Sequence, residues 1–109
     1  MLQDIRARFG RVQYREHSLL RPIERGIDPA CIREAVFSQD AEVIEDYPDH
    51  PYGPCCLVLG WWDDRRPLHV LVSTTDPPWL ITAWDPSNDP RNRWESDFRS
   101  RRRPPEEVE

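Results

Sequence analysis

Apolar residues recur at two spacings along the chain, and each spacing predicts a different kind of element. Between residues 17 and 38 the spacing is helical, and Ile32, Ala35 and Val36 form one apolar stripe. Asp28 followed by Pro29 suits the N-cap and first position of a helix. Gly26 suits the left-handed residue that follows a helix end. The pattern therefore predicts two short helices, over residues 17–25 and 29–38.

Between residues 41 and 84 the apolar residues lie at strand spacing or in short continuous runs. Strands are predicted at residues 41–47, 55–62, 67–74 and 80–84. In the third of these strands, Leu68, Val70 and Val72 share one face. His69, Leu71 and Ser73 share the other. Turn-forming residues fill the gaps, and residues 63–66 (DDRR) predict a four-residue hairpin turn. Connections this short favour antiparallel pairing.

The last segment returns to helical spacing. Trp94 and Phe98 are four residues apart within residues 91–103, which predicts a C-terminal helix anchored to the sheet by these two rings. The sequence thus predicts one α+β domain over residues 1–109. In it, two short N-terminal helices pack on an antiparallel sheet of three to four strands, and a C-terminal helix follows. We expect a loosely ordered lead-in over residues 1–13 and a loosely ordered tail over residues 104–109.

Charged residues are unevenly distributed along the chain, and this distribution bears on which partners the protein could bind. The formal net charge is −5, and all 15 basic residues are arginines. Residues 38–90 hold ten acidic residues and two arginines, whereas both ends of the chain carry a small positive excess. The overall acidity argues against strong non-specific nucleic-acid binding, which depends on neutralised phosphates. A local cationic groove remains open, and the acidic middle suits a basic partner.

The sequence offers no cofactor, metal or membrane signal. The three cysteines, of which Cys55 and Cys56 are adjacent, form no CxxC pair, so neither a disulfide framework nor a zinc ribbon is indicated. No apolar run is long enough to span a membrane, and the N-terminus lacks the apolar core of a secretory signal. We therefore expect a cytoplasmic protein that binds neither metal nor cofactor and does not insert into membranes.

Four segments together carry a family resemblance over roughly residues 14–99. They read HSLLRPIERGI from residue 17, VIEDYPDHPYGPCCLVLG from residue 43, RPLHVLVS from residue 66 and LITAWDPSNDPRNRWESDF from residue 80. In this order and spacing they resemble the small bacterial proteins grouped as domain-of-unknown-function family 4258. That family is similar to the compact RelE-like and BrnT-like toxins of bacterial toxin–antitoxin modules. The resemblance implies a toxin-like protein that cuts RNA and is silenced by an antitoxin protein.

The residue types needed for such chemistry are present. Metal-independent RNA cleavage needs proton transfer and cations that stabilise the charged phosphorane. His17 is the candidate proton-transfer residue, and Arg21 and Arg25 are the candidate phosphate clamp because a guanidinium can bind two phosphate oxygens. His69 is a candidate second acid or base. Pro22 is tolerated most easily in a first helical turn, so we expect the helix to start near residues 20–21 and His17 to lie in the loop before it.

Each candidate also has a structural interpretation. The arginines fit an ordinary solvated helix face, and His69 fits a hydrogen-bonded core histidine. Trp61 and Trp62 are neighbours in a strand and must face opposite ways, so one of them is available to stack a base or pack on a partner unless a helix covers it. A non-catalytic protein-interaction domain is therefore the alternative function. An enzyme acting on a small molecule is a third, and its substrate is not indicated.

Overall fold

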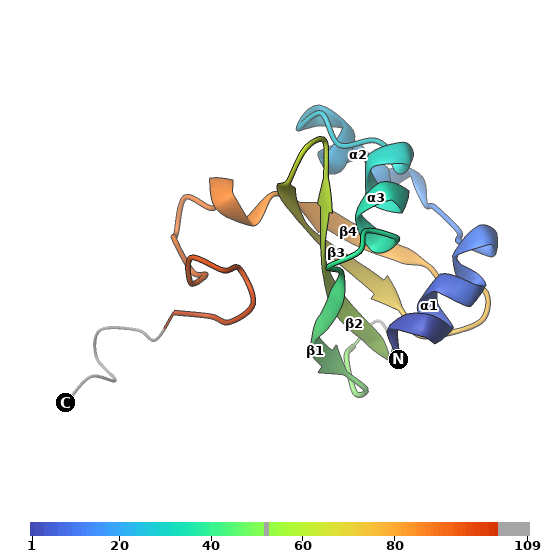
Figure 1. The fold of residues 1–109 in the computed structure, drawn as a ribbon. Helices are drawn as coiled ribbons and strands as arrows, with labels where there is room; N and C mark the ends of the chain where they lie inside the picture. Colours follow the sequence, from blue (N-terminus) through green and yellow to red (C-terminus); the bar gives the residue numbers. More distant parts are fainter. Residues whose placement is uncertain (52, 103–109) are drawn as a thin grey trace.

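The chain folds around a four-stranded antiparallel sheet with strand order β1-β2-β3-β4. We describe it from a computed structural model that covers residues 1–51 and 53–102. The strands are β1 (Glu42–Tyr47), β2 (Cys55–Trp62), β3 (Arg66–Ser73) and β4 (Leu80–Trp84). Helices lie on one side of this sheet, and the chain that follows β4 lies on the other side (Figure 1). The predicted α+β class and the antiparallel meander are confirmed.

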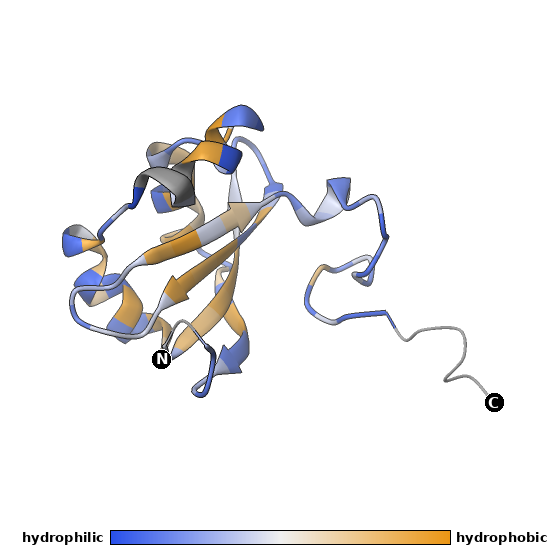
Figure 2. Ribbon diagram, turned by 180° about the vertical axis from the view of Figure 1, so that it is seen from behind, coloured by the Kyte–Doolittle hydropathy of each residue, from blue (hydrophilic) through white to orange (hydrophobic). Residues whose placement is uncertain are grey.

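The helical side of the sheet carries the larger core. Its helices are α1 (Leu2–Arg8), α2 (Glu16–Glu24) and α3 (Pro29–Val36). Helix α3 packs on β2 and β3, and α2 packs on β4. The strands supply Cys56, Val58, Leu68, Val70 and Val72 to this core. Figure 2 shows the apolar strands at the centre and a largely hydrophilic chain after β4. None of the described helices is long and apolar enough to cross a membrane.

The expected loose lead-in is wrong for most of residues 1–13, because α1 and a short 3-10 helix (Phe9–Arg11) occupy them. Ile5 and Phe9 from this segment are buried in the core, with exposed fractions of 3% and 1%. Arg6 fixes the helix to the end of α3 by donating to the carbonyls of Val36 and Ser38 at 2.9 and 2.7 Å. The apolar residues of this segment recur only every third or fourth position between charged ones, so their helical stripe is short and gives a weak signal in the sequence.

The start of α2 also differs from the prediction. The helix begins at Glu16, so His17 lies within it, and Pro22 is inside the helix and buried. Pro22 has no N–H to donate to the carbonyl of residue 18, one turn earlier, so this short helix lacks one of its internal hydrogen bonds. The end is as predicted: Gly26 has φ +80°, its N–H bonds to Ile23 at 2.9 Å, and the N–H of Ile27 bonds to Pro22 at 2.8 Å. These paired bonds form a Schellman motif.

The hairpin turn between β2 and β3 is one residue shorter than predicted. Trp62 pairs with Arg66, which leaves Asp63, Asp64 and Arg65 as the turn. All three have positive φ angles, of 44°, 58° and 75°. Non-glycine residues in this region carry a strain of about 1 kcal/mol each or more. The N–H of Asp63 donates to Glu34 on α3 at 2.9 Å, which helps to hold the turn against the helix.

The predicted C-terminal helix is wrong for the described part of its range. Residues 89–102, which we call the C-terminal arm, form turns closed by a bridge between Trp94 and Arg101. Asp89 accepts hydrogen bonds from the N–H groups of Arg91 and Arg93, and Asn92 and Phe98 have φ angles of +49° and +62°. These left-handed residues interrupt any helix that starts here. The predicted tail, 104–109, lies outside the described residues.

The contact between α3 and β2 gives a direct test of the fold. A Cβ added to Gly60 would lie 2.0 Å from the carbonyl oxygen of Ala35, a backbone atom that moves only with the helix. We expect Gly60→Ala to lower the free energy of unfolding by about 1–3 kcal/mol, as overpacking does. Gly10→Ala is the control, because nothing lies within 4 Å of its added Cβ. Urea denaturation of both variants checks this, and equal stabilities would contradict the packing described.

Candidate functional site

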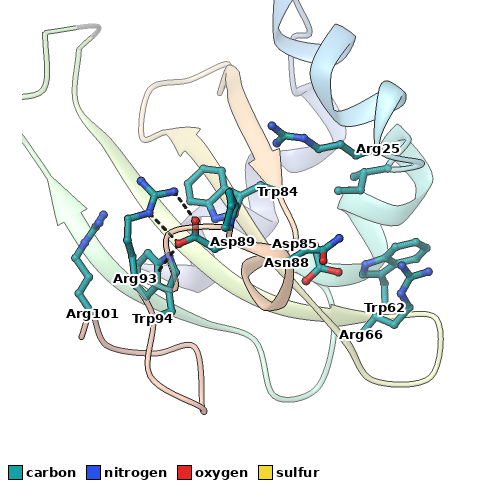
Figure 3. Close-up of a pocket in the computed structure, with 12 residues that line it drawn as sticks. Arg25, Trp62, Arg66, Trp84, Asp85, Asn88, Asp89, Arg93, Trp94 and Arg101 are labelled. Carbon is teal, nitrogen blue, oxygen red and sulfur yellow. Dashed lines mark hydrogen bonds and ion pairs between the residues drawn. The ribbon is translucent and has the colours of Figure 1, made fainter. Parts of the chain in front are cut away.

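The ends of three strands meet at one end of the sheet and border a cleft of about 540 Å³ (Figure 3). Trp62 ends β2, Arg66 starts β3 and Trp84 ends β4, and all three line the cleft. Arg25, which follows α2, closes one side, and the C-terminal arm closes the other. We call this the arginine–tryptophan cleft because its lining includes four arginines, Arg25, Arg66, Arg93 and Arg101. Its three tryptophans are Trp62, Trp84 and Trp94.

The four arginines differ in how far their charge is already neutralised. Arg93 pairs with the buried side chain of Asp89 at 2.8 Å, and Arg101 pairs with Glu45 on β1 at 2.9 Å. The Arg93 guanidinium lowers the pKa of Asp89 to about 2. The Arg101 pair attaches the arm to β1, whereas the Arg93 pair stabilises a turn within the arm. They leave Arg25 and Arg66 as the more available cations.

Arg66 and Arg25 lie at the end of the cleft nearest the helices (Figure 3). Arg66 stacks on the Trp62 ring at 4.6 Å and is 3.5 Å from Asp63, a long ion pair between two exposed side chains. The side chain of Arg25 has no hydrogen-bond or ion-pair partner among the described residues. An exposed ion pair of this length neutralises little of the charge. This end of the cleft therefore presents positive charge beside an aromatic ring.

The tryptophans come from both faces of the sheet. Trp62 packs against the helix-side core, whereas Trp84 pairs with His69 on the opposite face. The predicted divergence of Trp61 and Trp62 is consistent with their alternation in β2. The indole Nε1–H groups of Trp62 and Trp84 are buried and have no acceptor among the described residues. Each is a hydrogen-bond donor that a bound group could satisfy.

His69 is sealed beneath the arm rather than presented to the cleft. It is fully buried, with Trp94 centred 4.3 Å and Trp84 centred 5.5 Å from its ring. Its Nε2–H donates to the carbonyl of Phe98 at 2.8 Å, and its Nδ1 has no partner within the described chain. Burial lowers the pKa of His69 to about 4, so the ring is neutral at physiological pH. This geometry matches the structural interpretation better than the acid–base one.

The other predicted residues are spread along α2. Arg21 is exposed, and among the predicted residues whose side chains are described, Arg25 alone lines the cleft. His17 and Arg25 are eight residues apart, which corresponds to about 12 Å along a helix axis. The side chain of His17 lies outside what the structure describes. His69 is on the sheet face opposite the helices, whereas the backbone of His17 belongs to α2.

Most of the residues that line the cleft carry no functional signal in the sequence. Arg66, Asp85 and Asn88 each lie in or beside a turn, where charged and polar residues are expected for solubility alone. What these residues share is their position in the fold. They lie at or just beyond strand ends that the antiparallel order brings to one end of the sheet. Among the described residues, no group of three His, Cys, Asp or Glu side chains is arranged to hold a metal ion.

The burial of His69 predicts a pH dependence of stability. Between pH 6.5 and about 4 the unfolded chain protonates this histidine and the folded chain does not. The free energy of unfolding should therefore fall as the pH drops through this window, by an amount on the order of 3 kcal/mol. His69→Gln keeps a donor for Phe98 but cannot titrate, so its stability should change less over the same window. Parallel pH profiles for wild type and variant would contradict the buried neutral ring.

Comparison with known proteins gives one match. No curated protein and no solved structure matches the chain. One family model matches residues 14–85, about two thirds of the chain, and it covers the segment from just before α2 to the end of β4. The C-terminal arm lies outside the matched region. By this match the chain belongs to the family described as a domain of unknown function, DUF4258.

Proposed function

We propose that this protein is the toxin-like member of a toxin–antitoxin pair and that it binds RNA in the arginine–tryptophan cleft. The observation that carries the proposal is the convergence of four arginines and three tryptophans on one cleft. Single-stranded nucleic acid is bound by this combination, because arginine holds the phosphates and aromatic rings stack the bases. An acidic small molecule would need the arginines but not three tryptophans.

The local charge supports this interpretation despite the acidic total. The cleft lining has four arginines and two aspartates, whereas the whole chain is at −5. Asp89 is bound to Arg93, so the remaining charges favour an anion. A guanidinium binds two phosphate oxygens at once and stacks on rings. Arg66, which is already stacked on Trp62, is positioned to do both.

The cleavage step depends on His17. An in-line attack by the ribose 2′-hydroxyl needs a group that removes its proton, and Arg25 or Arg66 would stabilise the charge that develops on the phosphate. His17 is the candidate for that proton transfer, with Arg21 as a further phosphate contact on α2. His69 is not included in this mechanism, because it is sealed by Trp94 and its pKa is lowered to about 4.

The second candidate is a non-catalytic interaction domain. The burial of His69 beneath the arm favours the interaction domain, because no histidine ring that the structure describes lines the cleft. In this case the tryptophans and the acidic strand β1 would hold a partner protein. The two proposals differ in their dependence on His17, which only the catalytic one requires.

Expression in a bacterial host without an antitoxin tests the proposal. We expect slowed growth and RNA degradation, both relieved by the double variant Arg25→Ala/Arg66→Ala because the cleft then loses its available cations. Arg33→Ala is the matched control: Arg33 stacks on Phe37 at 4.7 Å, much as Arg66 stacks on Trp62, but outside the cleft. Relief by His17→Ala would support cleavage.

Other outcomes separate the candidates. Normal growth and intact RNA, with folded protein at high level, would contradict the toxin proposal. The interaction domain predicts instead that Trp84→Ala weakens capture of a partner protein, while His17→Ala leaves capture unchanged.

A further inference from the structure

We propose that the arginine–tryptophan cleft takes one unpaired nucleotide and selects a base that carries an exocyclic amino group, with Asp85 as the residue that reads it. The inference rests on the proposed RNA binding and adds a base preference to it. A cleft of about 540 Å³ is within the size range of sites for ligands as large as a nucleotide.

The arrangement of charge within the cleft leads to this assignment. Arg25 and Arg66 lie toward one end, Arg93 and Arg101 lie toward the other, and Asp85 lies between them beside Asn88 (Figure 3). A carboxylate in the middle of the cleft repels phosphate, so the sugar–phosphate backbone would follow the arginines. Asp85 would then face the base. Trp84, the preceding residue in the chain, supplies a ring next to the same position.

One oxygen of Asp85 is available for this contact. Its Oδ1 accepts from the backbone N–H of Ser87 at 2.9 Å and from the Ser87 hydroxyl at 2.5 Å, which fixes the carboxylate at the start of a short 3-10 helix (Pro86–Asn88). None of the described residues bonds to its Oδ2. The second aspartate in the cleft is not free in this way, since Arg91 and Arg93 occupy both of its oxygens.

A carboxylate oxygen only accepts hydrogen bonds, so it distinguishes bases by their donors. Cytosine presents an N4 amino group where uracil presents the O4 acceptor, although the two pyrimidines have nearly the same size and shape. A carboxylate oxygen placed to accept from N4 of cytosine meets O4 in a uracil bound in the same position, because the N3–H donor of uracil lies one position away along the base edge. In that position Asp85 favours cytosine and is repelled by O4 of uracil. Asn88 has an amide that can donate to an acceptor on the same base edge, which also fits cytosine. Adenine and guanine carry amino groups and are compatible with the same contact.

The test compares binding of the 5′-fluorescein-labelled octamers rC8 and rU8 to the full chain by fluorescence anisotropy at pH 7.5. A hydrogen bond to a charged group contributes about 1.5–3 kcal/mol, so wild type should bind rC8 about tenfold or more tightly than rU8. Asp85→Asn keeps Oδ1 for Ser87 but replaces the reading oxygen with a donor. We expect the ratio to fall to about one or to invert, since the new amide can donate to O4.

Asp97→Asn is the matched control. Asp97 accepts from the N–H of Arg99 at 3.0 Å, two residues ahead, as Asp85 does from Ser87, but it is outside the cleft. Its rC8 preference should be that of wild type. Should Asp85→Asn fail to fold, titration of wild type with CMP and UMP, followed by tryptophan fluorescence, replaces the variant, and tighter binding of CMP is expected.

The outcomes distinguish the base preference from RNA binding itself. Equal affinity of wild type for rC8 and rU8, with both weakened by Arg25→Ala, would overturn the role of Asp85 and leave the RNA proposal standing. A preference retained in Asp85→Asn would also overturn that role. If neither octamer binds, the proposed function fails and the base preference fails with it.

Discussion

The packing of Trp94 on His69 and the hydrogen bond from His69 to the carbonyl of Phe98 hold the C-terminal arm against the sheet, and the arginine–tryptophan cleft depends on these contacts. The arm supplies Arg93, Trp94 and Arg101 to the cleft, and it makes no helix that would position them by itself. Burying a tryptophan removes a large apolar area from water, and the His69–Phe98 hydrogen bond fixes the register of the arm. The ion pair of Arg101 with Glu45 adds a second attachment, at β1. Without the arm, Arg25 and Arg66 would remain, but the cleft would lose Arg93, Trp94 and Arg101.

This dependence gives His69 a different role from the one its chemistry suggests. A histidine in a strand among aliphatic residues can be a catalytic group or a buried hydrogen-bonded residue. The local sequence does not distinguish these two roles. The covering Trp94 and the carbonyl of Phe98 decide between them, because they exclude water and occupy Nε2. A neutral imidazole is the form that such a site stabilises. The residue contributes to the cleft indirectly, by keeping the arm in position.

The local features of the fold could be predicted from the sequence, and those set by tertiary contacts could not. Asp28 caps α3 through the N–H of Cys31 at 2.9 Å, and Gly26 ends α2, because caps depend on neighbouring residues alone. Residues 55–62 form β2 as predicted, because a continuous apolar run has few alternatives in a short chain. In contrast, the arm is drawn into turns by Asp89, although the spacing of Trp94 and Phe98 fits a helix. The start of α2 could not be predicted from Pro22, because α2 keeps this proline in its interior, where proline normally disfavours a helix.

The same distinction between local pattern and tertiary contact applies to the candidate site. Arg25 belongs to the predicted phosphate clamp and lies in the cleft, but the other residues there come mainly from three strand ends and the arm. That set is defined by strand order and by the folding back of the chain after Pro86, which no local pattern encodes. Titration of ¹⁵N-labelled protein with a single-stranded RNA octamer, observed at the five tryptophan indole N–H signals, tests the central claim most directly. RNA bound in the cleft should shift the signals of Trp62, Trp84 and Trp94 and leave Trp79, which lies under Arg15 outside the cleft, unchanged. Shifts confined to Trp79 and Trp61, or no shifts at all, would contradict it.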